Sequence, residues 1–358
     1  MRETYCHATL VTQEGVGRDI CFEVDQGVFV DIAIGGTEGA DLGGAYVLPG
    51  FIDSHIHGFG PYDFEDPGCD FAGAAGALKR FGVTAFLPTV CPKENASYPL
   101  VNQEAILGFH LEGPFINPER MGGFSREQIL PYRLPLAEEI LAAFHGQARI
   151  MTAAPEMVAL PEFAALAQSF HVRLSAGHTQ ADLNTARSAF AGGFRAVTHF
   201  FNAMPGHHHR SPGIWDEAML NDQVTLEVIA DLHHVSAESL ALLIKCKGAS
   251  KLIAVTDSVC ARGPGFEIKD GLAYKNGVIC GSQSTMHDLF VNLVRRLNVP
   301  LPLAVSMTSA NIAKALGLML GDIRKGYRAD FLVMDEELHV KAVHTNMKME
   351  YCAQSACI

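Results

Sequence analysis

The sequence lacks the features that mark membrane proteins and nucleic-acid binders. It contains no run of about 18 uncharged apolar residues, the length that a membrane-spanning helix needs. It also lacks basic charge, since 27 Lys and Arg stand against 39 Asp and Glu, for a net charge of −12. An acidic chain is repelled by nucleic-acid phosphates and anionic lipid surfaces, so we expect neither nucleic acid nor a membrane as its main partner. A local site on such a chain can still bind a small anion.

Nucleotide-binding and disulfide patterns are missing as well. No G-x-G-x-x-G follows the strand-like segment at 51–53 and no G-K-[ST] occurs, so no motif favours a nucleotide cofactor. The nine cysteines are scattered, odd in number and never spaced as C-x-x-C, which favours reduced thiols over a disulfide framework. The polar opening segment 1–5 is not followed by the apolar core of a signal peptide. We therefore expect a cytoplasmic protein.

Both ends of the chain have the composition of β-strands. Residues 20–24 and 28–34 are rich in Val, Ile and Phe, and residues 330–335 and 340–343 near the other end are similar. With 358 residues, 48% of them hydrophobic, the chain is long enough for one domain of about 250 residues and a smaller one. We predict a small β-sandwich domain built from residues 1–48 and 325–358, around a larger domain of residues 49–324.

The middle of the chain alternates apolar, strand-like segments with helical patterns such as those at 71–81 and 180–192. Eight segments are strand-like: 51–53, 85–89, 106–112, 150–154, 173–178, 196–200, 225–231 and 252–257. Eight β–α repeats favour a closed (β/α)8 TIM-like barrel over an open doubly wound sheet. The predicted fold class is therefore α/β.

One stretch, residues 47–60, is the focus of the functional argument. A short apolar strand ends there in His55 and His57, one residue apart. Because side chains alternate faces along a strand, both imidazoles point to the same side, with Asp53 in register. Two imidazoles on one face form half of a metal site. For an isolated H-x-H, the alternative is a pair of polar residues at a strand end.

Other strand-like segments also end in side chains that can bind metals. These are Glu112, His178, His199, Asp231 with His233 and His234, and Asp257. In a barrel the C-terminal strand ends meet at one mouth, so these residues become neighbours and predict a centre of one or two metal ions. Imidazoles and carboxylates suit Zn²⁺, Fe²⁺, Mn²⁺ or Co²⁺. Asp257 can accept a proton from water and pass it to a leaving group, unless backbone donors merely satisfy it.

Seven motifs together support a family assignment. They are PGFIDSHIHG (49–58), GFHLEGPF (108–115), SAGH (175–178), THFFNAMP (198–205), IADLHHV (229–235), VTD (255–257) and GSQSTM (281–286). With them the chain resembles the amidohydrolase superfamily and, within it, the N-acetylglucosamine-6-phosphate deacetylases, along nearly its full length. H-x-H indicates only the superfamily, whereas HLEGPF and HFFNAMP together are far more specific to the deacetylases.

The resemblance implies an activity and a set of functional residues. The expected reaction is metal-dependent hydrolysis of the N-acetyl amide of N-acetylglucosamine 6-phosphate to glucosamine 6-phosphate and acetate, in amino-sugar catabolism. Glu112, His178 and His199 are implied as principal metal ligands, His55 and His57 as ligands of a second ion, and Asp257 as catalytic acid and base. Zinc is the first expectation, with iron, manganese or cobalt as alternatives. The implied substrate contacts are Gly123, Asn202, Ala203, Arg210, His234, Cys280, Gly281 and Ser282.

Two further points follow from the resemblance. The arginine at the position of Arg210 can reach a neighbouring subunit in family members, which implies a homodimer; a guanidinium also pairs well with phosphate oxygens. After HLEGPF, family members usually have a histidine that polarises the substrate carbonyl, but this chain has Phe124 there. Phenylalanine donates no hydrogen bond, so polarisation would fall to a metal or to one of the histidines 207–209.

Three other functions remain open from the sequence. N-acetylgalactosamine 6-phosphate differs from the expected substrate in the configuration of a single hydroxyl, which motifs do not report. Another amidohydrolase, such as a cyclic amidase or an N-acyl-amino-acid deacetylase, would not require phosphate. A catalytically silent barrel that acts as a binding protein would be expected to have lost ligands, whereas this chain has all of them.

Overall fold

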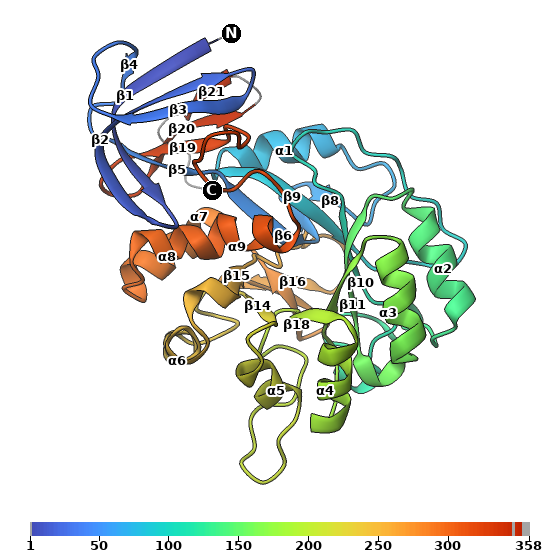
Figure 1. The fold of residues 1–358 in the computed structure, drawn as a ribbon. Coiled ribbons are helices and arrows are strands. Elements are labelled where there is room, and N and C mark those ends of the chain that lie inside the picture. Colours follow the sequence, from blue (N-terminus) through green and yellow to red (C-terminus); the bar gives the residue numbers. More distant parts are fainter. Residues whose placement is uncertain (1, 346–347, 353–358) are drawn as a thin grey trace.

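The computed structural model describes residues 2–345 and 348–352 and divides them between a parallel barrel and a separate sheet made from both chain ends (Figure 1). Residues 353–358 of the predicted C-terminal segment lie outside the described residues. Within the described part of the chain, no helix is long and apolar enough to cross a membrane.

Eight parallel strands form the barrel in chain order. They are β6 (Phe51–Ile56), β9 (Val83–Val90), β10 (Phe109–Glu112), β11 (Ala148–Ala153), β12 (Arg173–Ala176), β13 (Phe194–Val197), β14 (Thr225–Val228) and β15 (Leu252–Ala254). Ile56 and Ser258 form a parallel bridge between the first strand and the segment after the last, and N of Asp257 donates to O of His55 at 2.9 Å. This pairing closes the barrel, so the (β/α)8 prediction is confirmed.

Helices cover the outside of the barrel. They are α1 (Phe71–Lys79), α2 (Leu134–Ala143), α3 (Leu160–Ser169), α4 (Leu183–Gly192), α5 (Ile214–Leu220), α6 (Ala237–Lys247), α7 (Met286–Val291), α8 (Leu301–Val305) and α9 (Asn311–Ala315). Several begin at a side chain that accepts an otherwise unpaired backbone N–H, such as Asp182 for α4 and Ser236 for α6. Because helices cover the sheet, β6 and β9 are buried along their whole length.

The second sheet combines strands from both termini. They are β1 (Arg2–Thr12), β2 (Gly15–Asp25), β3 (Val28–Ile34), β4 (Ala40–Asp41), β5 (Tyr46–Pro49), β19 (Phe331–Met334), β20 (Val340–Thr345) and β21 (Lys348–Tyr351), in the order β21-β20-β19-β5-β1-β2-β3 with β4 beside β1. The sheet curls until its layers face each other, since the rings of Phe29 and Phe331 lie 6.0 Å apart although three strands separate β3 from β19. The layers of the predicted sandwich thus belong to one continuous sheet.

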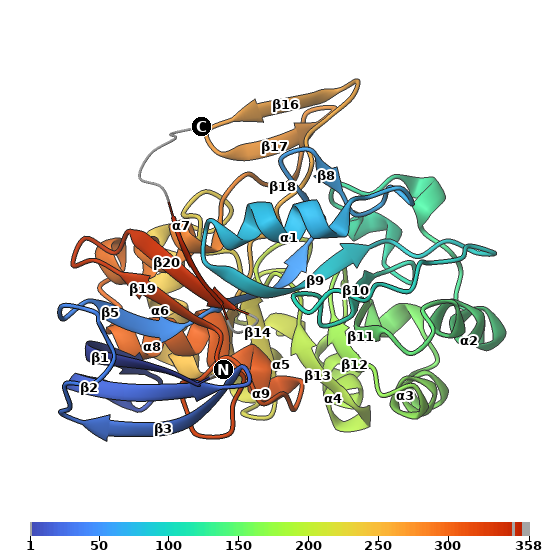
Figure 2. The same ribbon diagram turned by 90° about the horizontal axis from the view of Figure 1, so that it is seen from above.

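A three-stranded antiparallel sheet stands above the barrel mouth (Figure 2). It consists of β16 (Phe266–Lys269), β17 (Leu272–Lys275) and β18 (Val278–Ser282), and a short pair, β7 (Gly58–Phe59) and β8 (Tyr62–Asp63), lies nearby. Both of its turns, Asp270-Gly271 and Asn276-Gly277, have positive φ at the two central residues, as type I′ hairpin turns require. This sheet was not predicted from the sequence. The dipeptides D-G and N-G, which favour such turns and here flank the strand β17, were the sequence signal that could have indicated it.

Candidate active site at the barrel mouth

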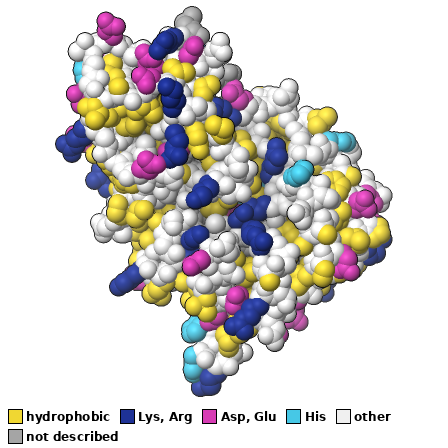
Figure 3. Space-filling model, viewed as in Figure 1, with side chains coloured by type: hydrophobic (Ala, Val, Ile, Leu, Met, Phe, Trp, Pro, Cys, Tyr) yellow, Lys and Arg dark blue, Asp and Glu magenta, His cyan; other side chains and the backbone are white. Residues whose placement is uncertain are grey.

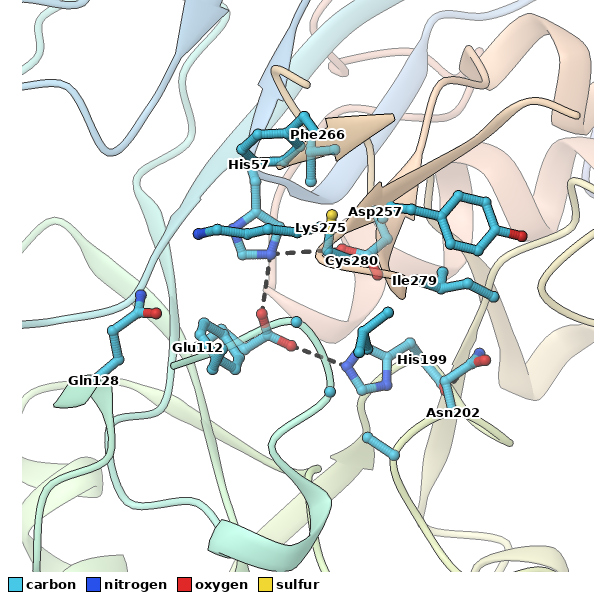
Figure 4. A pocket seen from close by; sticks show the side chains of 18 of the residues that line it. His57, Glu112, Gln128, His199, Asn202, Asp257, Phe266, Lys275, Ile279 and Cys280 are labelled. Carbon is cyan, nitrogen blue, oxygen red and sulfur yellow. Dashed lines mark hydrogen bonds and ion pairs between the residues drawn. The ribbon is translucent and has the colours of Figure 1, made fainter. Parts of the chain in front are cut away.

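A cleft of about 900 Å³ opens at the C-terminal ends of the barrel strands, and residues of the β16–β18 sheet form part of its lining (Figure 4). Most of the residues predicted for the site line it: His57, Glu112, Gly123, His178, His199, Asn202, Ala203, His234, Asp257, Cys280 and Gly281. The topology therefore brings together residues more than 200 positions apart in the sequence, as a barrel does for its strand ends.

The predicted metal ligands converge on one carboxylate. Oε1 of Glu112 lies 3.0 Å from Nε2 of His178 and 2.9 Å from Nε2 of His199. Its Oε2 lies 2.9 Å from Nε2 of His57 and 3.5 Å from Nε2 of His55. Glu112 thus presents one oxygen to each pair of imidazoles, and Figure 4 shows it between His57 and His199. This arrangement suits a carboxylate shared by two metal positions.

The electrostatics of the cluster keep Glu112 charged. Burial by itself opposes its ionisation, but the charge of His55 and the hydrogen bonds of His178 and His199 hold its pKa well below the usual range. Conversely, burial disfavours protonation of His57, yet Glu112 raises the pKa of that imidazole overall. The cluster is therefore an anionic centre that stabilises positive charge.

Two imidazoles turn Nε2 toward this carboxylate. Nδ1 of His55 lies 3.1 Å from Oε2 of Glu227, and Nδ1 of His178 lies 2.7 Å from the backbone oxygen of Arg120. Both acceptors take a hydrogen from Nδ1, so Nε2 is the nitrogen that faces the oxygens of Glu112. Either a proton or a metal ion on Nε2 makes that contact favourable. A divalent metal that replaces the proton leaves each ring neutral with the Nε2 lone pair as its ligand, so the donor set fits a divalent metal.

Three residues of the cluster have left-handed backbone conformations. The φ angles of His178, His199 and Asp257 are 49°, 29° and 48°. Residues other than glycine rarely adopt this region, and such strain concentrates at functional sites, where the surrounding structure imposes it. Each residue follows a barrel strand, so the sharp turn directs its side chain into the mouth.

Asp257 lies next to the imidazole pair at the start of the barrel. Its Oδ1 is 3.4 Å from Nε2 of His55 and 3.5 Å from Nε2 of His57. Its backbone is held on both sides, because N donates to His55 O and O accepts from Ser282 N, each at 2.9 Å. The carboxylate is 14% exposed and lines the cleft, so it can contact both the metal positions and a bound molecule.

Asp231 has a different role from the one its position suggested. It accepts hydrogen bonds from the backbone N–H groups of His233 and His234, at 2.9 and 2.8 Å, and contacts Nδ1 of His234 at 2.7 Å. A carboxylate engaged in this way orients an imidazole rather than binding a metal. Nε2 of His234 is left for a ligand in the cleft.

Arg210 and Ser282 are not among the residues that line the cleft. Arg210 lies in the loop between β13 and α5, which protrudes from the body, and histidines and a basic side chain gather at its tip (Figures 1 and 3). Ser282 is fully buried, and its hydroxyl donates to the backbone oxygen of Thr256 at 2.6 Å. Neither side chain reaches the cleft of its own chain.

The structure adds residues that sequence analysis missed. The β16–β18 sheet contributes Phe266, Tyr274, Lys275 and Ile279 to the cleft, and Gln128 lies opposite (Figure 4). The sequence did not indicate them because no strand had been predicted there.

Two buried residues beneath the ligands, His110 and Glu227, were also missed. His110 precedes Glu112 by two positions and therefore shares its strand face, which was a usable signal. Glu227 is a single charge within an otherwise apolar strand.

Comparison with known proteins shows the family to which this chain belongs. The model of the amidohydrolase family matches residues 46–357. The chain belongs to the amidohydrolase family. Membership implies a divalent metal ion, and this amidohydrolase presents His and Glu groups that can bind one: His55, His57 and Glu112, and Glu112, His178 and His199.

The similar proteins include deacetylases of amino-sugar phosphates. This amidohydrolase is 31% identical to the N-acetylglucosamine-6-phosphate deacetylase of Bos taurus, over 89% of this chain and 87% of the relative. It is 26% identical to the N-acetylgalactosamine-6-phosphate deacetylase of Escherichia coli O157:H7, over 93% of this chain and 95% of that relative. The crystal structure of N-acetyl-D-glucosamine-6-phosphate deacetylase from Mycobacterium smegmatis superimposes with a TM-score of 0.87 at 28% identity, over 97% of this chain and 99% of that one.

Proposed function

We propose that this amidohydrolase hydrolyses the N-acetyl amide of N-acetylglucosamine 6-phosphate, giving glucosamine 6-phosphate and acetate, in amino-sugar catabolism. The observation that carries the proposal is the ligand cluster centred on Glu112, with Asp257 beside it, in a chain similar along most of its length to deacetylases of this substrate. The complete ligand set argues against a catalytically silent barrel.

The metal centre is assigned to five side chains. Glu112, His178 and His199 would hold one ion, and His55 and His57 would hold a second that shares Glu112. Zinc is the first expectation, and iron, manganese and cobalt accept the same ligands. When bound, such ions lower the pKa of water towards ~7 and polarise a carbonyl oxygen.

Asp257 is assigned as the residue that moves protons. Its carboxylate takes a proton from the attacking water as the water oxygen bonds to the amide carbon. It then gives that proton to the sugar nitrogen as the C–N bond breaks, so that acetate and a free amine leave. Oδ1 of Asp257 lies 3.5 Å from Nε2 of His57, next to the proposed metal positions, and this proximity supports the assignment.

The cleft provides the substrate contacts. Gly123, Asn202, Ala203, His234, Cys280 and Gly281 line it and are assigned to the sugar phosphate. Phe124 packs edge-on against His178 with ring centroids 5.2 Å apart, so it forms an apolar wall where family members have a hydrogen-bond donor. Carbonyl polarisation is therefore assigned to the metal centre, since no atom of Phe124 supplies it.

We further propose a cytoplasmic homodimer in which Arg210 completes the phosphate site of the neighbouring subunit. The exposed loop of histidines 207–209 and Arg210 supports this, because it protrudes from the body (Figure 1) and none of its four residues lines the cleft of its own chain. We keep the division into residues 1–48 with 325–358 and residues 49–324, which is supported by the change of sheet between β5 and β6. Ser282 remains a proposed contact through the turn that it shares with Cys280.

The decisive experiment measures acetate release from N-acetylglucosamine 6-phosphate by the purified protein, with the unphosphorylated sugar and the galacto epimer in parallel. Rapid turnover of the gluco compound that depends on phosphate is the expected result. Faster turnover of the galacto epimer would support the same mechanism and show that N-acetylgalactosamine 6-phosphate is the substrate. Equal turnover of phosphorylated and unphosphorylated sugars would favour another amidohydrolase activity, and no turnover by the metal-loaded protein would refute the proposal.

A further inference from the structure

A layer of buried polar side chains lies beneath the metal-ligand cluster inside the barrel. Glu227 is 1% exposed, and His110, Thr152, Ser175 and Thr198 are fully buried. Each comes from a different strand or strand end, and none lines the cleft. Burying five polar groups, one of them a carboxylate, is costly unless they have specific partners, so their contacts need an explanation.

His110 belongs to a chain of hydrogen bonds whose direction can be deduced. Its Nδ1 lies 2.9 Å from the backbone oxygen of Ser54, which can only accept, so Nδ1 carries the hydrogen. Burial lowers the pKa of His110 to about 4, so the ring is neutral and its Nε2 accepts from the hydroxyl of Thr152 at 2.8 Å. Thr198 then donates to Thr152 at 2.7 Å, and Ser175 donates to Thr198 at 2.6 Å.

This chain leaves His110 with no free nitrogen. Although ligand atoms of His55, His110 and Glu227 lie close enough to suggest a third metal group, both ring nitrogens of His110 are already engaged. Within the described part of the chain, the only side-chain hydrogen bond to the carboxylate of Glu227 comes from Nδ1 of His55, at 3.1 Å. The hydrogen bond of Glu227 therefore holds His55, while its charge also acts on His110 and Arg173.

The two halves of the cluster are supported differently. In the half formed by Glu112, His178 and His199, a backbone oxygen holds the ring of His178. In the other half, a buried charge holds the ring of His55. A carboxylate that accepts the Nδ1 hydrogen fixes the tautomer and makes Nε2 a stronger donor to a metal.

We infer that Glu227 is a positioning residue that maintains the second metal position, the one formed by His55, His57 and Glu112. It holds the His55 ring with Nδ1–H directed at its own carboxylate and the Nε2 lone pair directed at the cluster. The inference rests on the proposed metal centre, and it extends that centre to a residue that contacts neither metal nor substrate. Occupancy of the second position then depends on Glu227, whereas occupancy of the first does not.

The test titrates metal-free protein with Zn²⁺ and measures stoichiometry and affinity by calorimetry and elemental analysis. Glu227→Gln keeps the side-chain shape and removes the charge, and Ser175→Ala is the matched control, because it changes the same buried layer without touching a proposed ligand. The wild type should bind two ions per chain. Glu227→Gln should bind one of the two ions about 10–100-fold less tightly and the other as before, and Ser175→Ala should match the wild type.

Two ions bound equally tightly by Glu227→Gln and the wild type would overturn the inference and leave the proposed function standing. A wild type that binds one ion or none would overturn the two-ion centre, and the inference with it. If Glu227→Gln does not fold, ¹⁵N-histidine spectra of the metal-loaded wild type decide, with His55→Gln for assignment. A hydrogen on Nδ1 of His55 supports the inference, and a hydrogen on Nε2 refutes it.

Discussion

The ligand cluster and the loop of residues 206–211 differ in nearly every physical respect. Glu112, His178 and His199 are 2–4% exposed and are surrounded by strands whose pairing fixes their positions. In the loop, the side chain of His207 is 53% exposed, and among the described residues the guanidinium of Arg210 hydrogen-bonds only to its neighbour His209, at 3.0 Å. The cluster is complete within one chain, whereas the loop presents a guanidinium to solvent.

This difference separates the two tasks of the proposed enzyme. Bond cleavage needs groups held within tenths of an ångström, which a barrel mouth provides. Recognition of the phosphate needs a cation that can reach the far end of the substrate, and an exposed loop can supply it to a partner subunit. Changes in the cluster should therefore affect turnover and metal content, and changes in the loop should affect substrate affinity.

The largest effect is expected from Asp257→Asn. Asparagine keeps the shape of the side chain but cannot accept a proton, so kcat should fall by about 10²–10⁴-fold. Elemental analysis should find the wild-type metal content, because Asp257 is not among the proposed ligands. Activity above a tenth of wild type would show that the proton passes through another group.

Removal of the metal should have the next largest effect, and it should act on stability. Binding of metal to the folded state alone stabilises it by about 4 kcal/mol when free metal is a thousandfold above Kd. A chelator should therefore lower the melting temperature measured by circular dichroism. Arg210→Ala should leave it unchanged, because exposed substitutions alter stability by about 0.5 kcal/mol or less. If the chelator and Arg210→Ala lowered the melting temperature equally, the contrast between a structural ligand cluster and an exposed loop would be wrong.

Arg210→Ala should raise KM for the phosphorylated sugar by about 10²-fold, in line with about 2–5 kcal/mol for a lost interfacial charge pair. Turnover of the unphosphorylated sugar should not change, and Arg210→Lys should recover only part of the loss because lysine lacks the planar fork.

The subunit that receives Arg210 can be identified by mixing variants. Co-expressed Arg210→Ala and Asp257→Asn chains, each inactive at low substrate, should form a heterodimer with one working site if the arginine acts across the interface. No recovery of activity would place Arg210 in its own subunit or outside the site.

Phe124→His should have the smallest effect. If the metal centre already polarises the carbonyl, an added donor should change kcat by less than about tenfold, or 1.4 kcal/mol. A larger increase in kcat would show that carbonyl polarisation limits the turnover of the wild type. Phe124→Leu serves as the control, because it keeps an apolar wall and adds no donor.

Much of the fold was predictable because its signals are local. The apolar segments that became β6, β9 and β15 are short and separated by helical patterns, so their number alone indicates a barrel. The β16–β18 sheet was missed even though Asp270-Gly271 and Asn276-Gly277 are strong hairpin turns. Its first strand is largely exposed, only short parts of the other two are buried, and the sheet carries charged residues, so hydrophobic periodicity does not detect it.

The candidate site was predictable where a functional residue stands at the C-terminal end of a strand. His55 and Glu112 lie in the last two positions of β6 and β10, Asp257 comes three residues after β15, and any barrel brings such residues together. Glu227 was not predictable in this way, because a glutamate within a strand is equally compatible with a bound ion, a salt bridge or an exposed face. Only its 3.1 Å contact with Nδ1 of His55 distinguishes among them.

The sequence by itself therefore determined the number of barrel strands, the residues at their ends and the family, since these depend on residue types and their order. The tertiary structure decided which oxygen of Glu112 faces which imidazoles, which ring nitrogens carry hydrogens, and that Arg210 lies outside the cleft of its own chain. The physical reason is that hydrogen bonds and metal contacts depend on distances of about 3 Å between atoms far apart in the chain, and only strand register and barrel closure set those distances.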